Sequence, residues 1–171
     1  IVNTHTIYNE DSGTITNFNA INSKSSGVII NSGEIDNRQA GKITNSNKFT
    51  NLGTITNTGA INNNFSGVIY NLNQITNIYG VISNSGKINN NNFGSISNNG
   101  IVNNNLSGKI NNYHIIFNTN TINNNGIIDN KQSGTITNND NGVIVNQTFN
   151  PLDVNSSKQF PNIGIHKSRG T

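Results

Sequence analysis

The chain has 171 residues, of which 10 are basic and 7 acidic, so its formal charge is +3 and only 10% of its residues are charged. Such a sparse charge argues against a nucleic-acid-binding protein, because those proteins gather Lys and Arg on one face. No apolar run approaches the roughly 18 residues of a transmembrane helix, and the absence of Cys excludes disulfides and thiolate metal sites.

A short phrase, Gly-x-Ile-x-Asn, repeats from residue 1 to about residue 146. In GTITNTGAINNNFSG, residues 53–67, Ile55 and Ile61 each lie two residues after a glycine and two before an asparagine. Over the whole chain we find 22 such apolar positions, 20 of them Ile, and the residue two later is Asn in 21 cases. Although 42 residues are Asn, so regular a placement predicts a repeated structure rather than disorder.

Each phrase predicts a short strand followed by a turn. Ile and Asn stand two residues apart and therefore share one face of an extended strand, while the residues between them point outward. The residue two before each Ile is Gly, Asn or His, as at His5 and His114. These types tolerate left-handed backbone angles, so we expect positive φ at the turns. Glycine every six to eight residues excludes helices.

A strand that cannot bury its Ile alone must stack on copies of itself, so the predicted fold is an all-β parallel β-solenoid. Stacking places Ile above Ile and Asn above Asn at about 4.8 Å. An unpaired inward Asn would cost about 1 to 3 kcal/mol, and for this reason we expect the asparagines to hydrogen bond to one another in ladders.

The predicted core ladder comprises Ile15, Ile21, Ile29, Ile35, Ile43, Phe49, Ile55, Ile61, Ile69, Ile75, Ile82, Ile88, Ile96, Val102, Ile110, Ile116, Ile122, Ile128 and Ile136. The predicted asparagine ladder comprises Asn17, Asn31, Asn37, Asn45, Asn51, Asn57, Asn63, Asn71, Asn77, Asn84, Asn90, Asn98, Asn104, Asn112, Asn118, Asn124, Asn130 and Asn138.

Two coil geometries fit the spacing of the strands. A three-sided coil of about 20 residues explains the recurrence of Ile at 15, 35, 55 and 75. A two-sided coil of about 14 residues explains why alternate gaps are six residues long. We favour three sides, because a corner with one residue between two inward ones suits a bend better than a reversal between sheets about 10 Å apart. The geometries differ in the neighbour of Glu34, which is Thr54 in three-sided coils and Lys48 in two-sided coils.

The phrase stops after residue 146, and both prolines of the chain lie beyond it, at Pro151 and Pro161. Proline cannot donate to a strand ladder, so the sequence predicts a solenoid domain over residues 1–146 and a cap or subunit-linking arm over residues 147–171. Apolar residues of this arm, together with the first residue of the chain, are the candidates for assembly contacts: Ile1, Phe149, Leu152, Phe160, Ile163 and Ile165.

The runs GTITNTG, GKITNSN and GTITNND resemble the Asn, Thr and Gly-rich β-solenoid repeats of microbial surface adhesins, autotransporter passengers and filamentous-haemagglutinin-like exoproteins. The resemblance covers residues 1 to about 146 and implies a structural role outside the cell or at a cell or particle surface. It supplies no functional residues.

The charged residues give no sign of catalytic chemistry. Glu34 and Asp36 flank Ile35 and should face solvent, and His5 and His114 occupy turn positions. We therefore expect no enzyme, no catalytic residue, no metal site, no cofactor, and neither a nucleic-acid partner nor membrane insertion. Two Asn-x-Ser sequons, at Asn64 and Asn105, fall in eight-residue gaps and are candidate glycosylation sites.

The function that these observations favour is a structural subunit of an extracellular or surface fibre. It would assemble head-to-tail with copies of itself through the solenoid ends and the C-terminal arm. The alternative is a stalk or passenger segment of a cell-surface adhesin or viral fibre, with surface glycans or receptors as further possible partners.

Overall fold

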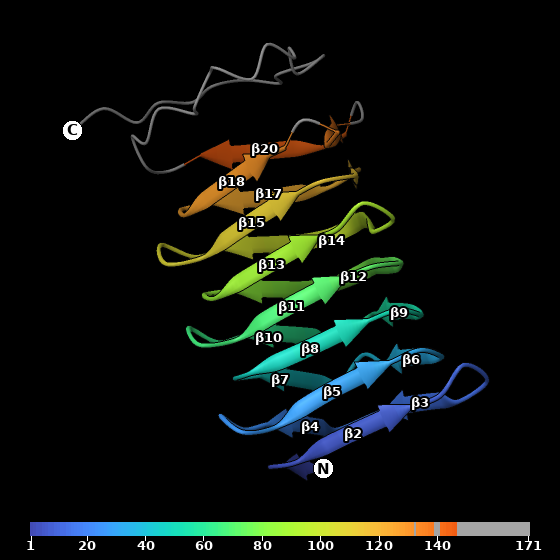
Figure 1. The fold of residues 1–171 in the computed structure, drawn as a ribbon. Helices are drawn as coiled ribbons and strands as arrows, with labels where there is room; N and C mark the ends of the chain where they lie inside the picture. Colours follow the sequence, from blue (N-terminus) through green and yellow to red (C-terminus); the bar gives the residue numbers. More distant parts are fainter. Residues whose placement is uncertain (132, 139–140, 147–171) are drawn as a thin grey trace.

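The computed structural model describes residues 1–131, 133–138 and 141–146. These residues form 20 short strands, all paired in parallel, that wind into a solenoid of about seven turns. Figure 1 shows the coils stacked one above another, with the first strands at one end of the stack and β20 at the other. The predicted all-β parallel solenoid is confirmed.

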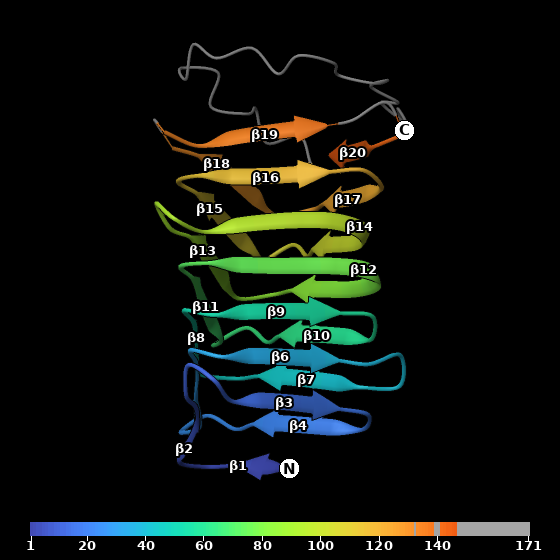
Figure 2. The ribbon, with the colours of Figure 1, turned by 90° about the vertical axis from the view of Figure 1, so that its right-hand side faces the viewer.

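The strands form three sides, which follow one another along the chain (Figures 1 and 2). Side 1 contains β1 (Val2–Asn3), β4 (Ala20–Ser23), β7 (Lys42–Asn45), β10 (Ala60–Asn63), the second parts of β12 (Gln74–Asn84) and β14 (Ser95–Asn104), β17 (Thr121–Asn124) and β20 (Val143–Asn146). Side 2 contains β2 (Thr6–Asn9), β5 (Val28–Asn31), β8 (Lys48–Asn51), β11 (Val68–Asn71), β13 (Lys87–Asn90), β15 (Lys109–Asn112) and β18 (Ile127–Asn130). Side 3 contains β3 (Thr14–Asn17), β6 (Glu34–Asn37), β9 (Thr54–Asn57), the first parts of β12 and β14, β16 (Ile115–Asn118) and β19 (Thr135–Asn138).

The register of the strands decides between the two coil geometries. Glu34 pairs with Thr54, and Ile35 with Ile55, so one coil is three strands and about 20 residues long. The two-sided coil of about 14 residues is therefore wrong. We number the coils from the N-terminus, each running from side 1 through side 2 to side 3; β1, β2 and β3 form coil 1.

The interior contains a column of Ile side chains on each side of the coil. Most are almost fully buried; Ile43 and Phe49 have no exposed surface, and Ile55 has 1%. Ile15 and Ile128, near the two ends, are only partly buried. A large aromatic ring is accommodated at Phe49 within a column of Ile.

The inward asparagines form three ladders, one per side, and every bond between them runs in the same direction. The amide nitrogen Nδ2 of one Asn donates to Oδ1 of the Asn in the next coil, for example from Asn37 to Asn57 and from Asn57 to Asn77, both at 2.7 Å. On side 3 the bonds link residues 17, 37, 57, 77, 98, 118 and 138. On side 2 they link residues 9, 31, 51, 71, 90, 112 and 130. On side 1 they link residues 45, 63, 84, 104 and 124, below which Asn3 donates to Ser23.

The same amide groups also close the corners. The Nδ2 atom of Asn57 donates to the carbonyl of Gly59, two residues later, at 3.2 Å. In a longer corner the same bond spans four residues, as from Asn37 to the carbonyl of Gly41 at 3.1 Å. We call these Asn-x-Gly and Asn-x-x-x-Gly arrangements short and long corners. Because one Asn position serves both, corner length varies without disturbing the ladder.

Glycine suits the turns because neighbouring coils come very close, and the expected left-handed backbone is absent at these glycines. Among the described residues no glycine has a positive φ. The one described residue with a positive φ is Tyr79, at 59°. A Cβ atom added to Gly53 would overlap the carbonyl oxygen of Gly33 in the coil below. The positive-φ prediction was therefore wrong, and the constraint is the space available above the preceding coil.

Asn73 and His114 show how a larger residue fits at a turn position. Where the turn residue is glycine, the backbone N–H of the following residue donates to the carbonyl of the turn residue in the coil below, as from Thr54 to Gly33 at 2.9 Å. After Asn73 the corresponding bond, from Gln74 to Gly53, is 3.3 Å, and after His114 the bond from Ile115 is 3.5 Å. The corner opens and weakens one backbone bond, which makes room for a Cβ atom.

We expect Asn57→Ala to destabilise the solenoid by about 2 to 3 kcal/mol, because it removes the acceptor of Asn37 and the donor to Asn77 in a buried ladder. Asn62→Ala, an outward Asn at the start of the next coil, should change stability by less than about 0.5 kcal/mol. Urea denaturation followed by circular dichroism measures the free energy of unfolding of both variants. An equal decrease in the two variants would show that the inward ladder does not stabilise the fold more than an outward Asn does.

Gly53→Ala should cost about 2 to 3 kcal/mol or prevent folding, because the new methyl group overlaps a backbone carbonyl that cannot move aside easily. The matched change is Asn73→Ala, at the same corner one coil later, where a Cβ is already present; it should cost less than about 1 kcal/mol. Thermal unfolding of the two variants makes the comparison, and a Gly53→Ala protein as stable as the parent contradicts the close-approach explanation.

Candidate interaction surfaces

The acidic and histidine side chains do not converge on a centre in the described part of the chain. No group of three or more His, Asp or Glu side chains that could hold a metal ion is found there. His5 contacts Thr4 through its ring Nδ1 at 3.0 Å, and Asp36 forms an ion pair with Arg38 at 2.6 Å. In the described part of the chain there is no helix of the length and apolarity needed to cross a membrane.

The two sequons lie at equivalent places, on the edge where side 1 meets side 2. Asn64 and Asn105 are each the second residue of a long corner. Their Nδ2 atoms donate to Ser46 Oγ and Ser85 Oγ at 2.9 and 2.8 Å. Asn64 is exposed and Asn105 is half-buried. Glycosylation at these residues stays a prediction.

The candidate assembly residues are only partly within the described chain. Ile1 is 69% exposed, and its amino group donates to the carbonyl of Ala20 in the coil above at 2.6 Å. Phe149, Leu152, Phe160, Ile163 and Ile165 lie outside the described residues, and so does the predicted arm, residues 147–171.

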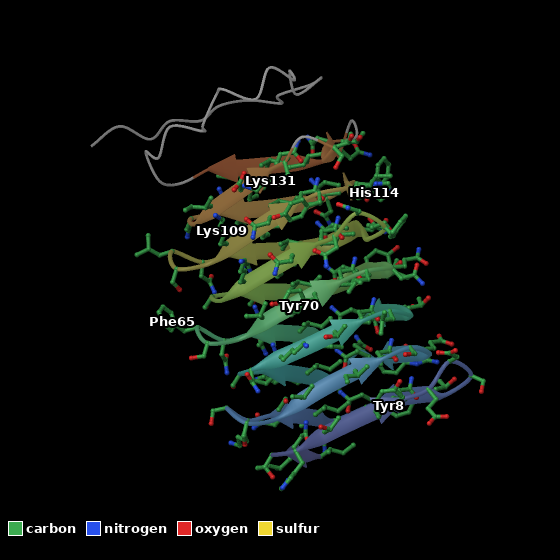
Figure 3. The ribbon with its side chains drawn as sticks, in the orientation of Figure 1. Tyr8, Phe65, Tyr70, Lys109, His114 and Lys131 are labelled. Atoms are coloured by element: carbon green, nitrogen blue, oxygen red, sulfur yellow. The ribbon has the colours of Figure 1, made fainter. Side chains whose placement is uncertain are left out.

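Side 2 carries a stripe of lysines and tyrosines. Lys87 pairs in register with Lys109 on the next strand, and two coils below Lys87 the ammonium group of Lys48 lies 5.8 Å from the ring centroid of Tyr70. Figure 3 shows Tyr70, Lys109 and Lys131 on the face formed by this side. The stripe was not predicted, because its members come into line only when the coil length is known.

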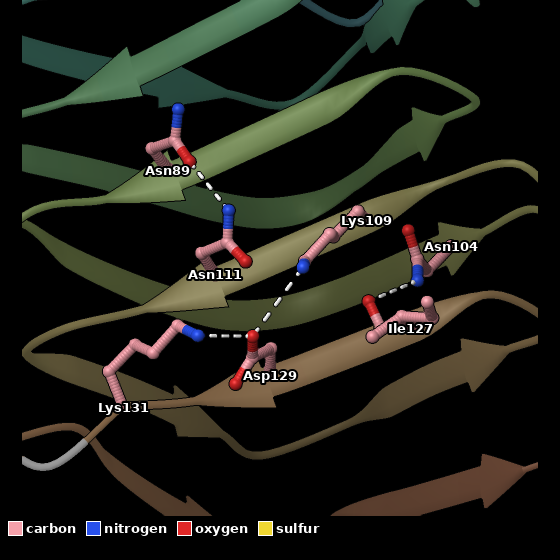
Figure 4. Close-up of polar contacts among 7 residues, drawn as sticks. All are labelled: Asn89, Asn104, Lys109, Asn111, Ile127, Asp129 and Lys131. Atoms are coloured by element: carbon pink, nitrogen blue, oxygen red, sulfur yellow. Dashed lines mark hydrogen bonds and ion pairs between the residues drawn. The ribbon is translucent and has the colours of Figure 1, made fainter. Parts of the chain in front are cut away.

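Asp129 lies among the lysines near the last coils (Figure 4). Its carboxylate accepts from Lys131 at 2.5 Å and lies 3.5 Å from the ammonium group of Lys109. The hydrogen bond with Lys131 lowers the pKa of Asp129 below 3.8, assisted by the positive charges of both lysines and opposed by partial burial.

An outer asparagine pair ends at this carboxylate. Asn111 donates to Asn89 Oδ1 at 2.7 Å, and both residues are buried although they lie on the outer face. The next position in the column is Asp129, which as a carboxylate offers only acceptors. Asn111 Oδ1 accordingly has no hydrogen-bond partner in the described structure.

Side 1 contains a shallow groove of about 190 Å³. It extends from coil 3 to coil 6 and is lined by the outward polar residues Lys42, Thr44, Asn62, Asn64, Ser83, Ser85 and Asn105, together with the inward Asn63. These residues are scattered in the sequence and become neighbours through the register of β7, β10 and β12. Sequence reasoning missed the groove for this reason.

We found no match for the chain among models of known protein families, curated proteins or solved structures. The β-solenoid with asparagine ladders therefore stands on the structure itself, and the resemblance to surface-protein repeats gains no support from a homologue.

Asp129 should make the solenoid less stable in acid. Its folded pKa is lower than 3.8, so its contribution is present above that pH and disappears as the pH falls through the lowered value. Because the carboxylate is partly exposed, the contribution should be below about 1 kcal/mol. Urea midpoints measured from neutral pH to well below 3.8 test this.

Asp129→Asn is the informative variant for the same experiment. It removes the titrating group, so the difference between variant and parent should shrink in acid. At neutral pH the loss of two lysine contacts is offset in part, because an Asn amide can donate to Asn111 Oδ1. A constant difference at every pH would contradict the assigned role of the carboxylate.

Proposed function

We propose that this protein is a structural element: a rigid solenoid rod that assembles head-to-tail with copies of itself into a fibre outside the cell or on a cell or particle surface. The resemblance of its repeats to those of microbial surface proteins supports the location. The alternative is that the same rod serves as a stalk or passenger segment of an adhesin or viral fibre.

The observation that carries the proposal is the single direction of the three ladders. Every bond between two inward asparagines runs from Nδ2 of the lower coil to Oδ1 of the upper coil. In coil 1 the Oδ1 atoms of Asn9 and Asn17 have no coil beneath them in the described structure. In coil 7 Asn130 and Asn138 donate to the carbonyls of their own corners, and the described chain has no Asn above them to accept a second bond.

The two ends of the rod are thus complementary, with acceptors at one and donors at the other. A second copy stacked in the same orientation would continue the ladders on these two sides and the Ile columns beside them. Such a contact is heterologous: it uses different surfaces on the two partners and does not close on itself, so repetition produces a fibre.

Backbone groups at the lower edge provide a way to test stacking without disturbing the fold. Glu34 donates its amide to the carbonyl of Gly13 in the coil below at 2.9 Å, and Thr14 occupies the same position in coil 1. Its amide therefore points to the lower edge, and Thr6 is placed alike on side 2. Both residues are the first of their strands, where proline is tolerated.

We expect the purified protein to form filaments visible by electron microscopy, and the double variant Thr6→Pro with Thr14→Pro to remain folded but unassembled. The double variant Thr6→Ala with Thr14→Ala keeps both amides and should assemble like the parent. Circular dichroism verifies folding. If the parent protein stays monomeric at high concentration, the fibre proposal is wrong and the stalk is the better interpretation.

The role of the C-terminal arm requires a separate comparison. A chain that ends at residue 146 should assemble more weakly than the full chain, because the arm's apolar residues are the proposed link between subunits. Sedimentation velocity at several concentrations measures the difference. Filaments that form equally well without residues 147–171 would exclude the arm and leave ladder stacking as the whole contact.

A further inference from the structure

The groove on side 1 is a hollow in which outward polar groups of several coils gather. We propose that it binds a linear oligosaccharide, with about three hexose units lying along the solenoid axis. The groove is on the flank of the rod, so this binding does not depend on whether rods assemble end to end.

The groove has the length and direction of a short sugar chain. Its floor is a column of outward side chains on successive coils, in which Thr44 pairs with Asn62 and Asn62 with Ser83. A second column, formed by Asn64, Ser85 and Asn105, continues it to coil 6. Three steps of about 4.8 Å make about 14 Å, and one coil step is close to the length of one hexose unit.

The polar groups of the floor are free to bind a ligand. The side chains of Thr44, Asn62 and Ser83 form no hydrogen bond within the described structure. By contrast, Asn103 and Asn123, higher in the same column, bond to each other at 2.9 Å. Hydroxyl and amide groups both donate and accept, which suits the hydroxyl groups of a sugar.

The groove is hollow because of corner lengths and side-chain size. Small residues, Ser83 and Ser85, occupy coil 5, where the edge between sides 1 and 2 has a short corner. The corners above and below are long, and they carry Leu106 and Phe65, both 77% exposed. Figure 3 shows Phe65 projecting from this edge. An exposed ring beside a polar groove offers an apolar surface for the C–H face of a sugar.

Lys42 adds a charge at one end of the groove. It has no ion-pair partner within the described structure, so it can bind a carboxylate of the ligand. We therefore expect an acidic sugar to bind more tightly than a neutral sugar of the same length, and the difference to decrease with salt.

The test is a titration of the isotopically labelled protein with cellotriose, chitotriose and trigalacturonate, followed by nuclear magnetic resonance. Binding should shift the side-chain amide signals of Asn62, Asn64 and Asn105 in at least one titration. If none of the three sugars shifts these signals, the proposal is overturned.

Ser83→Trp fills the groove and should weaken binding by roughly tenfold or more. Its matched control is Ser97→Trp, an outward serine of the same coil on side 3 with similar burial, which should bind like the parent. Equal affinity of the two variants contradicts the assigned groove.

Two further pairs locate the ends of the site. Phe65→Ala should weaken binding by roughly threefold, whereas Phe93→Ala, which removes an equally exposed ring from another corner, should not. Lys42→Ala should weaken trigalacturonate selectively. If both phenylalanine variants lose affinity, or neither does, Phe65 is not part of the site. If Lys42→Ala weakens binding of all three sugars equally, the proposed charge contact is wrong.

Discussion

The solenoid depends on the position of one amide group. Most inward asparagines bind both the carbonyl of their own corner and the Asn of the next coil, as Asn57 does, so one side chain fixes the bend of the chain and the stacking of the coils. A buried amide of this kind is costly when unpaired. Its partners are the asparagines at the equivalent position of the coils above and below. Loss of one inward Asn therefore leaves each of two other buried amides without one of its hydrogen-bond partners.

The second constraint is the distance between coils at the corners. Strands at the spacing of a parallel sheet bring the turn of one coil against the carbonyl of the coil below, and glycine leaves room for that contact. Where Asn73 or His114 stands instead, one backbone bond lengthens. The turn position is therefore selected by steric room and backbone pairing, although the residue types found there also suggest left-handed angles.

The sequence predicted the strands, the inward Ile and Asn, and the solenoid. Ile and Asn two residues apart share one face of a strand, and glycine marks the turns between strands, so the repeated strands must stack on one another. It left the number of sides open, since corner lengths of two or four residues allow both 14- and 20-residue groupings. The pairing of Glu34 with Thr54 resolved this. The groove and the lysine stripe could not be predicted, because neither Ser83 nor Lys109 has a neighbour on the outer face until the register is known.

The strictness of the interior explains how such a monotonous sequence can carry different surfaces. Inward positions and turn residues are fixed by packing, whereas outward positions and corner lengths are free to vary, and each variation is displayed at a defined height and side. Long corners above and below a short one, with small residues between, produce a hollow on side 1. Lysines at the same position of successive coils produce a charged stripe on side 2. Ladders of one direction would let the rod extend along its axis, so the proposed axial assembly and the proposed sugar binding would use separate sets of residues.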